Sequence, residues 1–99
     1  MTSERHRVRG DGWEQRAGFS RAVRAAGRVW VSATPGLHAD GSAPGDVIAQ
    51  TRVALRSVER ALTDAGSDLD HVVVVRAYFV QESDREAIAM ALQIGRAHV

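Results

Sequence analysis

The chain has 99 residues, enough for one small domain. Its 13 basic and 12 acidic side chains leave a net charge of +1, a balance that by itself argues against a nucleic-acid or acidic-membrane partner. The absence of cysteine excludes disulfides and thiolate nucleophiles and fits a reducing cytoplasm, where we expect the protein to act. No stretch approaches the roughly 18 consecutive apolar residues of a membrane span, so we expect no membrane partner.

The N-terminal residues 1–12 are polar, and we expect either an irregular lead or a weak edge strand around Arg7–Arg9. Further along, residues 35–45 hold a high density of glycine, proline and aspartate, which is typical of an exposed loop.

A β-hairpin is predicted between these two segments. Phe19, Arg21, Val23 and Ala25 alternate with Ser20, Ala22 and Arg24, Ala26-Gly27 supplies a turn, and Val29–Val31 is an apolar run with high β-propensity. The second strand ends at Ser32, and a polar side chain at the end of an apolar strand makes this position a candidate binding residue.

An amphipathic helix is predicted after the loop. Asp46 is placed to cap its N-terminus, and Gly66 supplies a stop at its C-terminus. Apolar residues recur every three or four positions along one face, so we expect the helix to lie on a sheet.

The following segment, Val72–Val80, starts with four valines and predicts a central strand covered on both faces. Strand, helix and strand then form a right-handed crossover. Ser83 or Asp84 is expected to open a second helix, with Ala87, Ile88, Ala91 and Leu92 on its apolar side.

The order and spacing of several short motifs resemble one known family. The motifs are Trp13-Glu14, Gly18-Phe-Ser-Arg-Ala-Val-Arg, Val29-Trp-Val-Ser32, Gly45-Asp-Val, Gln50-Thr-Arg and Leu69-Asp-His-Val-Val with Arg76. Taken together, they make residues 13–92 similar to the RidA family, also called YjgF/YER057c/UK114 or endoribonuclease L-PSP.

This resemblance implies an α+β, chorismate-mutase-like fold, with a mixed sheet and two helices on one face. It also implies a homotrimer with a ligand cleft between neighbouring subunits. Archetypal members hydrolyse enamines and imines derived from amino acids to 2-keto acids and ammonia, without a cofactor. A non-catalytic trimer that binds small molecules and an endoribonuclease are the alternative interpretations.

The resemblance carries three substrate-binding positions over to this chain. Ser32 matches a serine whose hydroxyl can hydrogen-bond a substrate carboxylate. Phe19 stands where archetypes have tyrosine, and Ala33 replaces the glycine that usually follows the serine. Ala89 aligns with an asparagine of the archetypes. These departures indicate a divergent member.

In the family, a carboxylate-binding arginine and a water-ordering glutamate follow the second helix, and no residue here matches them. We therefore expect an incomplete domain, with no catalytic residue of its own and no activity as a fragment. Residues 94–99 can be encoded by the start of a common sequencing adapter, so we interpret 93–99 as a non-native tail.

The remaining polar residues are expected to be structural. The four histidines have no partner at a suggestive spacing, and with Asp40 and Asp70 they are too scattered to predict a metal site. Residues 5–9 are expected to form a solvent-exposed, arginine-rich N-terminal segment. We expect the strand arginines Arg21, Arg24 and Arg76 to form ion pairs at the surface. The alternative is that they attract a carboxylate ligand.

Overall fold

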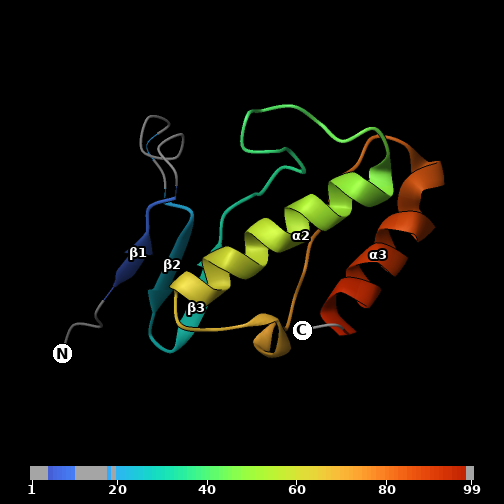
Figure 1. The fold of residues 1–99 in the computed structure, drawn as a ribbon. Coiled ribbons are helices and arrows are strands. Elements are labelled where there is room, and N and C mark those ends of the chain that lie inside the picture. Colours follow the sequence, from blue (N-terminus) through green and yellow to red (C-terminus); the bar gives the residue numbers. More distant parts are fainter. Residues whose placement is uncertain (1–4, 11–17, 19, 98–99) are drawn as a thin grey trace.

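The computed structural model describes residues 5–10, 18 and 20–97 and has an α+β fold (Figure 1). Two short 3₁₀ helices, Leu69–His71 and Glu82–Asp84, join the longer elements. No helix in the described part is both long and apolar enough to cross a bilayer. The longer elements are β1 (His6–Val8), β2 (Ala22–Ala25), β3 (Arg28–Val31), α2 (Val47–Asp64) and α3 (Arg85–Ala97).

The described strands form one antiparallel sheet in the order β1-β2-β3. Ala22 in β2 lies opposite Val8 in β1 and Val31 in β3, so these three side chains share one face of the sheet. The predicted edge strand exists, although it begins one residue earlier than expected, at His6.

The turn between β2 and β3 confirms the predicted hairpin. Ala26 and Gly27 both have positive φ, at 54° and 74°. Two consecutive residues with positive φ define a type I′ turn, whose twist matches that of the flanking strands. The hairpin register is therefore set locally, by two residues.

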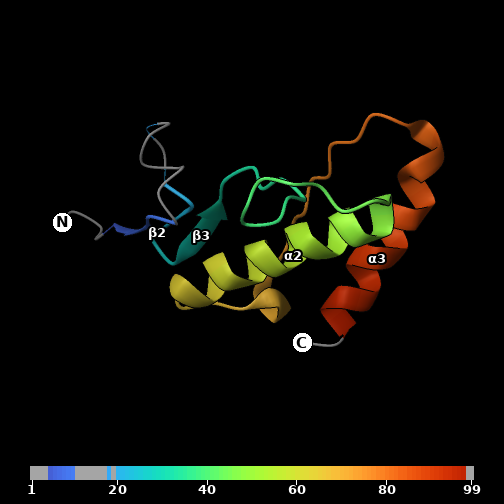
Figure 2. The same ribbon diagram turned by 45° about the horizontal axis from the view of Figure 1, so that its top comes forward.

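Helix α2 packs on the sheet face that carries Ala22. The Asp46 carboxylate caps the helix by accepting a hydrogen bond from the Ala49 N–H at 2.8 Å, as predicted. Ala61 and Ala65 lie in the same buried cluster as Val8 and Ala22. Figure 2 shows the loop from β3 running beside α2 to reach its N-terminus.

A second buried cluster lies farther from β1. Leu55, Leu62 and Leu69 are its buried members, and Val72 and Leu92 pack against it. The cluster therefore joins α2 to the residues before and after it and to α3.

The C-terminal end of α2 is capped by a strand arginine. The helix has no basic residue in its last turn. Instead Arg24 of β2 reaches across, and its Nη1 donates a hydrogen bond to the Ala65 carbonyl at 3.3 Å. A cation at this position interacts favourably with the negative end of the helix dipole. Gly66 ends the helix with φ of 84°, as the sequence predicted.

Helix α3 packs against α2. It follows the 3₁₀ turn that begins at Glu82, close to the predicted start. Of its predicted apolar side, Ile88 and Ala91 are buried, whereas Ala87 and Leu92 are half-buried. The described helix extends to Ala97 and so includes part of the segment 93–99.

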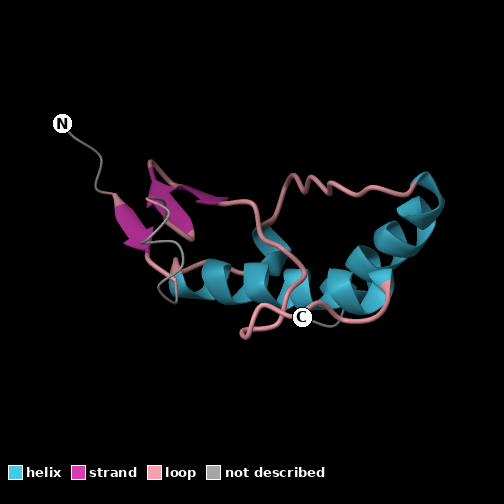
Figure 3. Cartoon of the chain, turned by 90° about the horizontal axis from the view of Figure 1, so that it is seen from above, coloured by secondary structure: helices cyan, strands magenta, loops and turns pink. Residues whose placement is uncertain are grey.

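The prediction of a strand at Val72–Val80 is wrong. The segment is not assigned to any strand, and no described residue pairs with it in a ladder. Figure 3 shows it on the same side of α2 as the strands. Without this strand, the expected crossover is not formed in the described residues. The physical reason is that β-propensity needs a partner backbone, and none of the described residues supplies one to residues 73–80.

We expect Gly66→Ala to destabilise the fold more than Gly41→Ala. Both glycines have positive φ, 84° and 88°, which costs an alanine about 1–2 kcal/mol. At Gly66 the added Cβ would also lie 2.6 Å from Arg24 Nη1, whereas open space surrounds Gly41. Urea denaturation followed by circular dichroism measures both changes. Equal losses of stability would contradict the Arg24 cap.

Candidate functional site

Ser32 lies directly after β3, where the hairpin opens. Its Oγ donates a hydrogen bond to the Ser20 carbonyl at 2.6 Å, and its backbone N–H donates to the Arg21 carbonyl at 3.0 Å. The side chain is half-buried. These two bonds continue the β2–β3 pairing beyond the last residues of the ladder and hold the hydroxyl in one orientation.

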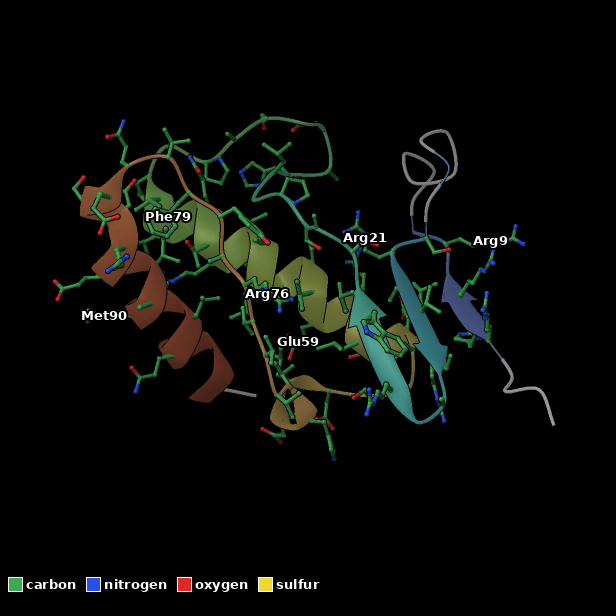
Figure 4. The ribbon with its side chains drawn as sticks, turned by 180° about the vertical axis from the view of Figure 1, so that it is seen from behind. Arg9, Arg21, Glu59, Arg76, Phe79 and Met90 are labelled. Carbon is green, nitrogen blue, oxygen red and sulfur yellow. The ribbon has the colours of Figure 1, made fainter. Side chains whose placement is uncertain are left out.

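The Arg21 guanidinium is held next to Ser32. Its Nη1 donates to Thr34 Oγ1 at 2.8 Å and to the Ala33 carbonyl at 3.3 Å. Thr34 Oγ1 in turn donates to the Ser32 carbonyl at 2.8 Å. Figure 4 shows Arg21 at the end of the hairpin opposite its turn. We call Ser20, Arg21, Ser32, Ala33 and Thr34 the Ser32 cluster.

The Ser32 cluster combines one permanent cation with three hydroxyl groups, those of Ser20, Ser32 and Thr34. A guanidinium binds a carboxylate more strongly and with better-defined geometry than an ammonium group does, and hydroxyls add a neutral donor. The cluster lies on a strand end supported by the sheet, so its groups are positioned before a ligand arrives. Recognition of a small carboxylate is the chemistry that this arrangement supports best.

The structure places two of the three predicted substrate-binding residues in this cluster. Ser32 contributes its hydroxyl, and Ala33 contributes its carbonyl as an acceptor for Arg21. Phe19 lies outside the described residues, so its predicted role stays a prediction. Thr34 was missed by sequence reasoning, although strand alternation places it on the same side of the chain as Ser32.

The strand arginines differ in their contacts. Arg24 donates to a helix carbonyl, so its role is to cap α2. In the described part of the chain, Arg76 has no salt bridge. The expected surface ion pairing is therefore not found for these two arginines among the described residues.

A polar pair with no counterpart in the sequence prediction joins Asp68 and His71. The two side chains lie three residues apart, with 2.8 Å between His71 Nδ1 and Asp68 Oδ1. The hydrogen bond and the charge of Asp68 raise the pKa of His71, and the same bond lowers the pKa of Asp68. No group of three or more potential metal-ligating side chains gathers anywhere in the described residues.

A comparison with protein families identifies the chain. The model of the family described as endoribonuclease L-PSP matches residues 12–94. The chain belongs to this family. This is the RidA (YjgF/YER057c/UK114) family, which the sequence motifs resemble.

Two relatives agree with the RidA family assignment. The chain is 35% identical over 101 residues to an uncharacterized protein of Streptomyces coelicolor, SCO2049, and the match covers 99% of this chain and 71% of that protein. The crystal structure of Rv2704 from Mycobacterium tuberculosis, a member of the YjgF/YER057c/UK114 family, has a TM-score of 0.81 and 35% identity. That match covers 93% of this chain and 74% of the other chain. The predicted fold class is thereby confirmed.

The Asp68–His71 pair predicts a pH-dependent contribution to stability. Because the pKa of His71 is raised, its contribution to the stability of the fold is complete below about pH 6.5. This contribution is lost as the pH rises through the raised pKa. Because the pKa of Asp68 is lowered, its contribution to the stability of the fold is present above about pH 3.8. This contribution is lost as the pH falls through the lowered pKa. The pair therefore stabilises the fold between these limits.

We expect His71→Gln to lower Tm slightly at about pH 5.5 and to leave it unchanged at about pH 9. The effect is small because both side chains are largely exposed. Differential scanning calorimetry of both proteins across this range measures it. A decrease of the same size at both pH values would contradict the charged pair.

Proposed function

We propose that the Ser32 cluster forms one wall of a binding site for small carboxylated imines or enamines. The observation that carries this proposal is the position of the Arg21 guanidinium, held against the Thr34 hydroxyl, which in turn donates to the Ser32 carbonyl. A carboxylate placed there would receive one charge-assisted contact from Arg21, and one hydroxyl contact once the Ser32 O–H turns from the Ser20 carbonyl to the ligand. The family assignment supports the choice of substrate class, since archetypal members act on such compounds.

The proposed reaction is addition of water to the imine carbon. A C–O bond forms and the C–N bond breaks, so the products are a 2-keto acid and ammonia, with the protons of water transferred to nitrogen. The iminium carbon is itself electrophilic, so the protein's contribution is to hold the carboxylate and orient the carbon toward water. No cofactor is required, and no residue of this chain is assigned as catalytic.

The Ser32 cluster lies at the surface, and we propose that a neighbouring subunit of a homotrimer supplies the opposite wall. The chain spans 71% and 74% of the two relatives, so we propose hydrolysis for a protein of their length and ligand binding for the cluster described here. We place the reaction in the cytoplasm, which suits a chain without cysteine.

We expect Ser32→Ala to weaken binding of 2-oxobutyrate, a ligand of the product class, by about 10- to 100-fold, the typical value of a hydrogen bond to a charged group. Isothermal titration calorimetry measures the change. Ser42→Ala is the matched control, because Ser42 is exposed and, among the described residues, its hydroxyl bonds Asp40 alone, at 2.6 Å. Unchanged affinity in Ser32→Ala would contradict the assignment of the site.

The reaction is tested separately, by ammonia release from freshly generated 2-iminobutyrate in a relative of full family length that carries the same cluster. Release that Ser32→Ala abolishes supports hydrolysis. Ligand binding without release would leave a non-catalytic binding protein, and RNA cleavage that follows the protein through purification would favour the endoribonuclease alternative.

A further inference from the structure

The side chains of β3 alternate between the two faces of the sheet. Val29 and Val31 are half-buried and pack against the buried clusters that α2 helps to form. Arg28 and Trp30 are exposed and point to the other side. This period of two is that of a β-strand with one face toward the protein. Figure 4 shows the strands in front of the end of α2, so the face in view is the one away from the helix.

The face that carries Trp30 also carries the Ser32 cluster. Val23 lies opposite Trp30, and two residues further along each strand the Ser32 N–H donates to the Arg21 carbonyl. Alternation therefore puts Arg21 and Val23 of one strand on the same face as Trp30 and Ser32 of the other. We call these four residues the Trp30 face. It consists of a polar row, Arg21 with Ser32, beside an apolar row, Val23 with Trp30.

The two rows are close enough to contact one small molecule. Two residues along a strand rise about 6.5 Å, and this distance separates the Cα atoms of Trp30 and Ser32. Trp30 and Arg21 are diagonal neighbours on adjacent strands, a separation that aromatic and long side chains bridge. A ligand that binds the polar row through its carboxylate can thus rest its other end on the indole ring.

Packing among the described residues does not account for a tryptophan at this position. Trp30 is 53% exposed, whereas tryptophan side chains in folded proteins are highly buried on average. Small-molecule sites combine an apolar and aromatic lining with a few fixed polar groups. The apolar row beside the Ser32 cluster provides such a lining.

We propose that Trp30 is the specificity-determining residue of the site at the Ser32 cluster, and that it selects 2-imino and 2-oxo acids with an aromatic side chain. This inference rests on the proposed function, because the carboxylate is held by Arg21 and Ser32 as described there. The indole then contacts the ring of the ligand, and Val23 extends the apolar surface beside it. Stacked or edge-to-face aromatic pairs gain more than their buried area accounts for.

Charge decides between an anionic and a cationic ligand on this face. An exposed indole by itself attracts cations as well as apolar rings. The described strands contain no acidic residue, however, and β1 places Arg7 opposite Val23, on the same face as Trp30. The guanidinium groups of Arg7 and Arg21 repel a cation and attract a carboxylate. An aromatic acid is therefore the class that fits both rows.

Two ligands that differ in a single group test the role of the indole. 2-Oxobutyrate and phenylpyruvate share the keto group and the carboxylate, but phenylpyruvate carries a phenyl ring where 2-oxobutyrate carries a methyl group. We expect isothermal titration calorimetry to show about tenfold tighter binding of phenylpyruvate, from ring contact and added apolar burial. Trp30→Val keeps high β-propensity and should reduce this ratio of affinities severalfold, whereas Trp30→Phe should retain most of it.

Tyr78→Val is the matched control, because Tyr78 is an exposed aromatic residue outside the described sheet, and it should leave the ratio unchanged. Circular dichroism establishes that each variant keeps its secondary structure. Equal affinity of the unmodified chain for the two ligands would overturn the proposal, as would a ratio that Trp30→Val does not alter. Equal weakening of both ligands by Trp30→Val would also overturn it, because the ring would then support only the shape of the wall.

Ser32→Ala separates this inference from the proposed function. We expect it to weaken both ligands by the same factor, because both bind through their carboxylate. If Ser32→Ala weakens both ligands and Trp30→Val leaves their ratio unchanged, the proposed function stands and the specificity role of Trp30 fails. If Ser32→Ala changes the affinity of neither ligand, the proposed function fails and this inference fails with it.

Discussion

The close packing of α2 against the sheet is the contact on which the rest of the molecule depends. It is made by small side chains: Ala61 on the helix, Ala65 directly after it and Ala22 on the central strand are each at most 1% exposed. Alanine lets two backbones approach closely and loses no side-chain entropy on burial. The contact also brings Arg24 within reach of the helix C-terminus, so packing and capping reinforce each other.

The Leu-rich cluster extends this contact away from the strands. Leu55 and Leu62 of α2 are buried there with Leu69, and Leu92 of α3 packs against them. Figure 3 shows the strands and, beyond them, the extended segment 72–80 on the same side of α2. One part of this region is therefore a hydrogen-bonded sheet, and the other is an apolar chain in which residues 73–80 make no backbone–backbone hydrogen bond to other described residues. This difference accounts for the exposed valines.

The Ser32 cluster is placed at the opposite end of the hairpin from its turn. The type I′ turn sets the register, the register puts Ser32 next to Arg21, and strand alternation brings Thr34 to the same side. A two-residue turn thus determines which polar groups meet at the site. The hydroxyl and guanidinium groups are then fixed by bonds to the backbone, so that little ordering remains for a ligand to induce.

The sequence by itself determined the elements whose causes are local. The Ala26-Gly27 turn, the Asp46 cap and the Gly66 stop each act within a few residues, so the hairpin and α2 were predictable, as was the serine at the strand end. The tertiary structure alone decided which groups meet across long separations. Arg24 caps a helix whose accepting carbonyl lies 41 residues away, and Thr34 holds an arginine 13 residues before it. It also decided that Val72–Val80 forms no strand here, because a ladder needs hydrogen bonds from a second backbone and β-propensity cannot supply one.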